Sequence, residues 1–285
     1  MKEKPAILVL LLFTLALASS CEAVKDVLGE SAGVDERFND SSVDHDNRNT
    51  DDVSHNSCIK SSTDPDSLSL STNLIEFYHF DEISGERTGV NSSINLNETG
   101  YVGSDMGVCE LGLKASDQTN SNYLAPSTTS SLSFNSSQDF SIAFWAKVDP
   151  SSAGYQFIYG DQTDFYVAFY VDGSNDVNVE VWMGGASTII NETAVFSANG
   201  NWNHFAISLD RDTNSVFYFN GTQYYDSSTP STAGSFTDVT NERIGHAIYT
   251  GNVDAVNGVI DEMGIWNKAL TAGEVSKLYS KEYNF

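Results

Sequence analysis

Residues 258–279 read GVIDEMGIWNKALTAGEVSKLY and carry the most specific pattern in the chain. The first part is almost continuously apolar, as in a buried strand, except for the adjacent carboxylates Asp261 and Glu262. A buried charge without a partner costs several kcal/mol, so both acids are expected to have partners in the folded protein. Successive side chains of a strand point to opposite faces. Regular alternation therefore predicts Asp261 on one face with Val259, Met263 and Ile265, and Glu262 on the other with Ile260 and Trp266.

The end of the same stretch predicts a short helix. Thr271 is followed three residues later by Glu274, which is the spacing of a capping box. Val275, Leu278 and Tyr279 then share one face of the helix, and this face is expected to pack on the sheet.

The region that precedes this stretch predicts further strands. From about residue 74 onward, roughly ten short runs rich in Phe, Tyr, Val and Ile are separated by clusters of Gly, Asn, Asp and Ser. No helical pattern lies between these runs, so an antiparallel sandwich or barrel is expected. Residues 140–148, FSIAFWAKV, are apolar on both faces, as in an inner strand. Asn220-Gly221 between two aromatic runs predicts a tight hairpin.

The first residues are expected to act as an export signal. Residues 1–20 combine a lysine-bearing start with a short apolar run and small residues, which is typical of a secretory signal peptide. The sequence LASSC at 17–21 resembles the bacterial lipoprotein box, which implies that Cys21 is lipidated. This resemblance implies an exported protein anchored by lipid to the outer membrane or cell surface. The alternative is ordinary signal cleavage with an unmodified Cys21.

Residues 21–72 are predicted to form a disordered linker. Positions 22–72 hold 12 acidic and 4 basic residues, many Ser, Asn and Asp, and hardly any aromatic residues. Such a segment buries too little apolar surface to offset its ordering entropy. If Cys21 is lipidated, Cys58 and Cys109 remain, and an oxidising compartment favours a disulfide between them. Two free thiols are the alternative.

The formal net charge is −25, from 39 acidic against 14 basic residues. A surface of this sign repels phosphate backbones, so nucleic acid is not expected as a partner, and the membrane is reached through the lipid alone.

Five segments in a fixed order carry a resemblance to a known family. They are YHFDEISG (78–85), FSIAFWAKVDP (140–150), GNWNHFAISLDRDTNSVFYFNG (200–221), RIGHA (243–247) and the opening stretch. Together they resemble the LamG-like jelly rolls of the concanavalin A-like lectin/glucanase superfamily. The resemblance implies an all-β, two-sheet antiparallel jelly-roll sandwich over residues 73–285, with one short C-terminal helix and with the first and last strands close together.

The same resemblance implies a structural calcium ion, which takes six to eight oxygen ligands. Asp81 and Asp261 are the implied ligands, with Asn91 or Asn97 where many relatives have an acid. The alternative is that Asp261 or Glu262 accepts hydrogen bonds from backbone amides or pairs with Arg243.

Catalytic motifs are missing from the sequence. No ExDxxE strand, HExxH, GxSxG or phosphate-binding loop occurs. His204 and His246 are interpreted as structural, and a lyase that uses either of them is the weaker reading. We therefore expect a protein that is not an enzyme.

Aromatic side chains are the predicted sugar-binding residues. In DFYVAFYVDG (164–173) the phenylalanines and Val167 share one face, and Tyr166 and Tyr170 share the other, which is predicted to form an exposed platform. Trp182, Tyr155 and Tyr249, next to turn signals, are the further candidates. The sequence thus favours a carbohydrate-binding, lectin-like module for an extracellular polysaccharide or glycan. The alternatives are an adhesion or envelope module that contacts another protein, and a divergent glycan-cleaving enzyme.

Overall fold

The structure is a computed structural model. It describes residues 58–119, 121–128, 132–150, 153–161, 164–183, 187–227, 235, 241–246, 248–249, 252–253 and 255–285. Signal peptide residues 1–20, Cys21 and linker residues up to 57 lie outside this part, so the predictions made for them stay predictions. The helices among the described residues include no candidate for a membrane span.

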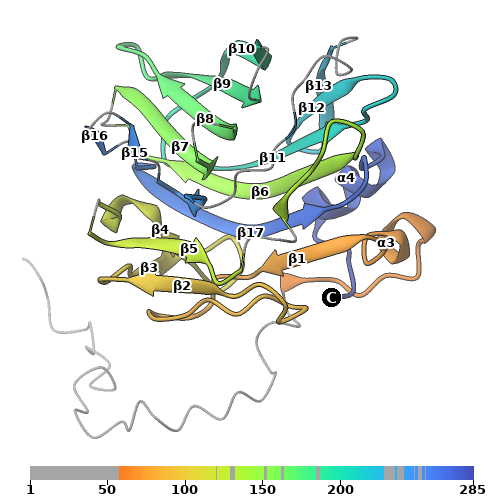
Figure 1. The fold of residues 1–285 in the computed structure, drawn as a ribbon, viewed down its shortest axis with the longest axis horizontal. Helices are drawn as coiled ribbons and strands as arrows, with labels where there is room; N and C mark the ends of the chain where they lie inside the picture. The colour runs from red at the N-terminus through yellow and green to blue at the C-terminus, as the bar shows by residue number, and fades with distance from the viewer. Residues whose placement is uncertain are drawn as a thin grey trace, which may run out of the picture. The chain divides into compact units, whose positions relative to one another are not determined.

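One sheet has eight strands, and the last strand of the chain lies near its centre (Figure 1). The path runs β13-β12-β11-β6-β17-β4-β3, and β1 pairs antiparallel with β17. The first and last long strands are therefore neighbours, as expected. The strands are β1 (Leu74–Tyr78), β3 (Ser104–Met106), β4 (Leu111–Lys114), β6 (Phe140–Val148), β11 (Trp202–Leu209), β12 (Ser215–Phe219), β13 (Thr222–Ser227) and β17 (Gly258–Trp266).

The second sheet has seven strands in the order β10-β9-β8-β7-β14-β5-β2. Its strands are β2 (Leu96–Thr99), β5 (Tyr123–Pro126), β7 (Gly154–Gly160), β8 (Phe165–Val171), β9 (Asp176–Met183), β10 (Ser187–Ser197) and β14 (Arg243–Ile244). A separate two-stranded ribbon joins β15 (Ile248–Tyr249) to β16 (Asn252–Val253). The described helices are α3 (Pro65–Ser69), the 3-10 turn η3 (Ala115–Asp117) and α4 (Ala272–Ser280).

The main core lies between the two sheets, which confirms the predicted sandwich. Alternate residues of each inner strand enter it, as the sequence predicted for β6 and β8. The core residues of these two strands are Phe140, Ile142, Phe144, Ala146, Val148, Phe165, Val167, Phe169 and Val171. At the predicted hairpin, Asn220 (φ 48°) and Gly221 (φ 75°) both have positive φ, as a type I′ turn requires.

The alternation predicted for β17 is wrong at one point. Glu262 has φ 49°, and the pairing of β17 with β6 changes register between Asp261 and Gly264. This β-bulge adds one residue and reverses the phase of the side chains that follow. Val259 therefore does not share a face with Met263 and Ile265. The residues of β17 in the main core are Ile260, Met263 and Ile265.

The bulge gives both acids partners outside that core. Asp261 Oδ2 accepts hydrogen bonds from the backbone amides of Val108 (2.8 Å) and Cys109 (3.0 Å). Glu262 accepts a hydrogen bond from the Tyr283 hydroxyl and lies 2.9 Å from His79 Nδ1. Backbone amides and side chains thus satisfy the two buried charges. Of the alternatives left open by the sequence, the contact with backbone amides is present.

The predicted domain boundary at residue 73 lies too late. Residues 58–72 belong to the same unit, and α3, which the sequence did not predict, packs beside α4 (Figure 1). Asp64 caps α3 by accepting a hydrogen bond from the Asp66 amide (3.0 Å), and Pro65 occupies the first helical position. The predicted disordered linker therefore ends at or before Cys58.

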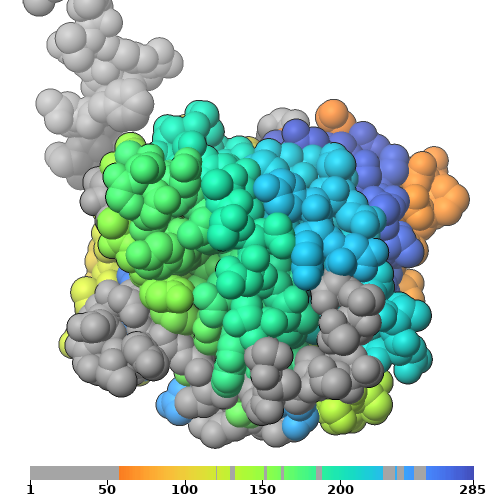
Figure 2. Space-filling model, turned by 90° about the horizontal axis from the view of Figure 1, so that it is seen from above, coloured from red at the N-terminus to blue at the C-terminus, as the bar shows by residue number. Residues whose placement is uncertain are grey.

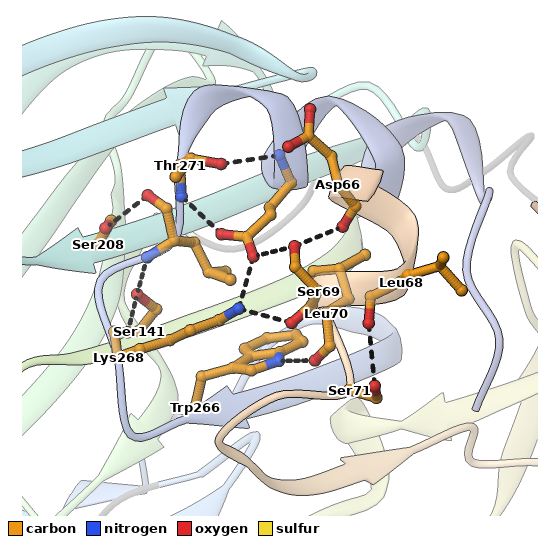
Figure 3. Close-up of polar contacts among 12 residues, drawn as sticks. Asp66, Leu68, Ser69, Leu70, Ser71, Ser141, Ser208, Trp266, Lys268 and Thr271 are labelled. Carbon is orange, nitrogen blue, oxygen red and sulfur yellow. Dashed lines mark hydrogen bonds and ion pairs between the residues drawn. The ribbon is translucent and has the colours of Figure 1, made fainter. Parts of the chain in front are cut away.

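Side chains from the C-terminal stretch hold this N-terminal segment in place (Figure 3). Trp266 Nε1 donates to the Leu70 carbonyl at 2.7 Å, and Lys268 Nζ donates to the Ser69 carbonyl at 2.7 Å. Glu274 pairs with Lys268 and accepts a hydrogen bond from the Ser69 hydroxyl. With Thr271, Glu274 also completes the predicted capping box of α4.

The structure contains the Cys58–Cys109 disulfide expected from the sequence, with a Cα–Cα distance of 5.6 Å. It connects the first described residue to the loop between β3 and β4, whose amides bind Asp261.

Candidate functional site

The outer face of β7, β8 and β9 carries a group of aromatic side chains. Tyr166 of β8 lies opposite Trp182 of β9, and Tyr170 lies opposite Tyr155 of β7. Phe157 follows two residues after Tyr155 on the same side of β7. We call these residues the aromatic face: Tyr155, Phe157, Tyr166, Tyr170 and Trp182.

Neighbouring rings of the aromatic face are in contact. Tyr166 and Trp182 stack with centroids 5.6 Å apart and an angle of 12° between their planes. Phe157 lies 5.2 Å from Tyr166 and 6.1 Å from Tyr155, and Tyr155 lies 5.1 Å from Tyr170. Tyr155 and Tyr170 are 44% and 40% exposed, and the strands β8 to β10 (green to teal) lie at the surface in Figure 2. Solvent therefore reaches part of a pre-arranged row of rings.

Glu180 fixes two of these rings. Its side chain shares the outer face of β9 with Trp182, opposite Ala168 of β8. Tyr166 Oη donates to Glu180 Oε1 at 2.6 Å, and Tyr155 Oη donates to Glu180 Oε2 at 3.2 Å. Hydrogen bonds to a carboxylate are stronger than those between neutral groups, so Glu180 holds both hydroxyls in a defined place.

The structure brings together four of the five aromatic residues predicted from the sequence: Tyr155, Tyr166, Tyr170 and Trp182. The fifth, Tyr249, belongs to β15, but its side chain lies outside the described part. Sequence reasoning missed Phe157 and Glu180. Glu180 and Trp182 are two residues apart on β9, so strand alternation could have placed Glu180 on the outer face. Its contact with two tyrosines depends on how three strands align.

Of the residues proposed for calcium, Asp81 and Asp261 both bind amides of the segment between β3 and the start of β4, whereas Asn91 lies apart from them. Asn91 Nδ2 donates to the carbonyls of Leu74 and Ile75, at the start of β1, whereas Asp81 follows β1 and accepts a hydrogen bond from the Leu111 amide at 3.1 Å. Within the described residues, no group of three or more His, Cys, Asp and Glu side chains is placed to hold a metal.

Asp261 is also engaged in other contacts. Burial, followed by the charges of Glu262 and, more weakly, Asp81, raises the pKa of Asp261 well above its usual value. Its Oδ2 accepts two amide hydrogen bonds and its Oδ1 accepts one from Glu262. In the described arrangement the oxygens of Asp81 and Asp261 bind backbone amides, and this arrangement does not fit a calcium ion. The calcium ion implied by the resemblance is untested and stays a prediction.

Adding 5 mM calcium is expected to change the melting temperature by no more than about 1 °C relative to EDTA. An ion bound with a Kd of about 0.1 mM would instead add about 2.3 kcal/mol of stability and raise the melting temperature by about 5 °C or more. Scanning calorimetry in calcium and in EDTA measures the two melting temperatures and distinguishes these outcomes. A rise of that size, abolished in Asp261→Asn, would establish the ion implied by the resemblance.

The histidines considered for catalysis are enclosed. His204 is 1% exposed beside Trp145 and Tyr279, and burial lowers the pKa of His204 to about 3. His246 is fully buried, its Nδ1 lies 3.2 Å from Arg243 Nη1, and burial lowers its pKa to about 4. Their environments agree with the structural interpretation of both residues.

Tyr159 and Glu242 form a buried pair that the sequence did not indicate. The Tyr159 hydroxyl donates to Glu242 Oε1 at 2.6 Å, and among the described residues Glu242 Oε2 has no hydrogen-bond partner. Burial raises the pKa of Glu242 well above its usual value, and the charge of Asp161 raises it further. The hydrogen bond from Tyr159 acts in the opposite direction and lowers this pKa. At 2% and 1% exposure, respectively, neither side chain is accessible to a substrate.

Glu242→Gln is expected to make the protein less sensitive to rising pH. Since the pKa of Glu242 is raised in the folded state, the folded protein holds this proton more tightly than the unfolded chain. The stability contributed by the proton is complete below the ordinary carboxyl pKa and is lost as pH rises toward the raised value. The wild type should therefore lose more stability than the variant when the pH rises from 5 to 8. Urea denaturation at both pH values measures this, with Asp212→Asn in an exposed turn as control. Equal losses in the wild type and Glu242→Gln would contradict it.

Comparison with known proteins agrees with this architecture. The family model described as the concanavalin A-like lectin/glucanases superfamily matches residues 118–276, more than half of the chain. The chain therefore belongs to this superfamily. No curated protein matches the sequence.

Solved structures share the fold at low sequence identity. The binding domain of Paraclostridial Mosquitocidal Protein 1 is 14% identical, with a TM-score of 0.58 over 74% of this chain and 52% of that chain. Domain 4 of AbnA, an extracellular arabinanase from Geobacillus stearothermophilus, in complex with arabinotriose, is 18% identical, with a TM-score of 0.53 over 73% of this chain and 98% of that chain.

Botulinum neurotoxin type C, which depends on interaction with two ganglioside molecules to enter cells, is 14% identical. Its TM-score is 0.52 over 75% of this chain and 54% of that chain. The chain thus spans about half the length of these two toxin structures. At such identities the likeness establishes the fold alone.

Proposed function

We propose that the protein is a carbohydrate-binding module and that the aromatic face is its binding surface. The observation that carries the proposal is the stack of Tyr166 and Trp182, held by Glu180 beside the exposed Tyr155 and Tyr170. Flat rings pack against the apolar face of a sugar, and polar groups beside them bond its hydroxyls. A rigid row of rings also loses little entropy on binding.

Two relatives of the same fold support this proposal. One is the AbnA domain, whose structure contains arabinotriose, and the other is the neurotoxin that interacts with gangliosides. The AbnA domain is matched over 98% of its length, so the likeness covers that whole domain.

We propose that this binding occurs without catalysis. Glycoside hydrolysis commonly uses two carboxyl groups about 5 to 9.5 Å apart. On the described outer face of β9, the other acid in phase with Glu180 is Asp176, four residues along the strand and therefore about 13 Å away. This separation is too large for the usual pair.

We also propose, from the sequence, that the module is displayed outside the cell by a lipid on Cys21. Detection of an acylated N-terminal peptide that begins at Cys21 would support this part of the proposal, and an unmodified Cys21 would contradict it.

Trp182→Ala is expected to weaken glycan binding by at least about ten-fold, since it removes one of two stacked rings from a pre-arranged surface. The full chain is first tested on a glycan array, and affinity for the glycan found is then measured by calorimetry. Tyr101→Ala is the matched control, because Tyr101 is an aromatic residue, 58% exposed, outside the aromatic face.

Equal affinity of the wild type and Trp182→Ala would contradict the proposed surface. An array without any binding would contradict glycan binding and would favour a protein partner, to be sought by pull-down.

A further inference from the structure

The region that builds the aromatic face has one sign of charge. Residues 148–210, which include β7 to β11, contain 8 acidic residues and no Lys or Arg. Glu180 lies in the middle of the aromatic face, between the row of Tyr166 and Trp182 and the row of Tyr155 and Tyr170. A ligand placed over these rings therefore comes within a few ångströms of a carboxylate.

The nearest candidate cation on this sheet is committed elsewhere. Arg243 belongs to β14, which β7 separates from β8, so their backbones lie roughly 9–10 Å apart. Its guanidinium stacks on the Tyr123 ring with its Cζ 3.6 Å from the ring centroid, and its Nη1 contacts His246. Arg243 is 9% exposed, so it offers little charge to a ligand on β8 and β9.

The spacing of the rings sets the size of the ligand. Tyr166 and Tyr170 are four residues apart on β8, which is about 13 Å. Glu180 lies between the two rows and can only accept hydrogen bonds when it is ionised, so it suits the hydroxyl donors of a sugar in the middle of a short chain. A ligand carboxylate or sulfate at that place would meet a like charge, and the described strands β7 to β10 offer no Lys or Arg to compensate it.

Building on the proposed function, we propose that the aromatic face binds oligosaccharide chains of sugars without acidic groups and rejects uronate, sialylated and sulfated chains. Rejection has two parts. The net charge of −25 repels anionic glycans at long range and is screened by salt. Glu180 repels an acidic group at short range, where screening by salt is weak.

The experiment uses matched neutral and acidic probes. Binding of the full chain is measured by calorimetry to neutral galactan and β-glucan, and to the same polysaccharides after oxidation of their primary hydroxyls to carboxylates. In 0.5 M salt, where the long-range part is screened, the Kd for the oxidised form is expected to exceed that for the neutral form by about ten-fold. Glu180→Gln keeps a side chain that can bond both tyrosine hydroxyls, and it should lower this ratio at least about three-fold. Asp212→Asn, in an exposed turn, removes one charge elsewhere and should leave the ratio unchanged.

Each result separates this inference from the proposed function. The inference is supported if the protein binds the neutral polysaccharide, if Trp182→Ala weakens this binding, and if the ratio of the two Kd values falls in Glu180→Gln but not in Asp212→Asn. Equal or tighter binding of the oxidised form overturns it while the proposed function stands. An unchanged ratio in Glu180→Gln overturns the short-range role of Glu180. Absence of binding to either form and to the array, or binding that is indifferent to Trp182→Ala, overturns the proposed function itself.

Discussion

Replacing both Cys58 and Cys109 with serine is expected to lower the free energy of unfolding by about 4 kcal/mol. The disulfide joins residues 51 positions apart, so it removes much conformational freedom from the unfolded chain. It also holds the loop whose amides bind Asp261, and the loss of these contacts would leave Oδ2 of this buried carboxyl group without its two amide donors. Urea denaturation followed by tryptophan fluorescence measures the change.

Cys21→Ser is the control for this experiment, because Cys21 takes no part in the disulfide. The wild type in reducing buffer should behave as the double serine variant does. A loss below about 1 kcal/mol in both would show that the disulfide adds little to the stability provided by the sandwich.

Trp266→Ala is expected to destabilise the protein by about 3–5 kcal/mol, the usual cost of removing a large buried ring. Trp266 is fully buried between the sheet and the N-terminal segment, with Phe77 at a ring distance of 6.3 Å. Gly264 leaves room for it, because a side chain there would collide with the indole ring. The variant also leaves the Leu70 carbonyl without the indole N–H.

Trp266→Phe separates these two effects. It keeps most of the buried ring but loses the hydrogen bond to Leu70, and its expected cost is about 1–2 kcal/mol. Limited proteolysis should then cut residues 58–72 earlier in Trp266→Ala than in the wild type. Unchanged proteolysis and a cost below about 1 kcal/mol would contradict the role of Trp266 in holding the N-terminal segment.

Most local features could be predicted from the sequence because they depend on neighbours in the chain. The alternation in β8 correctly separates Phe165 and Phe169, inside, from Tyr166 and Tyr170, outside. The capping box of α4 and the hairpin at Asn220 also follow from short spacings. Here the physical reason is the same: the period of a strand, a helix turn or a tight turn is fixed by backbone geometry.

Features that depend on contacts between distant residues could not be predicted. The bulge at Glu262 arises from the pairing of β17 with β6, and nothing in the local pattern marks it. Residues 58–72 have the composition of a linker, yet Trp266 and Lys268 bind their backbone across about 200 positions. The sum of such contacts offsets the entropy of ordering this segment.

The pattern of residues was enough to predict a two-sheet sandwich of strands with a short final helix, and to predict that tyrosines of β8 face outward. The position of those tyrosines relative to other groups depends on the tertiary structure. Tyr155, Tyr166 and Glu180 belong to β7, β8 and β9, respectively. The alignment of these three strands places Glu180 between the two tyrosines. The parity of a side chain is a local property, but the register between strands is set by the packing of the whole core.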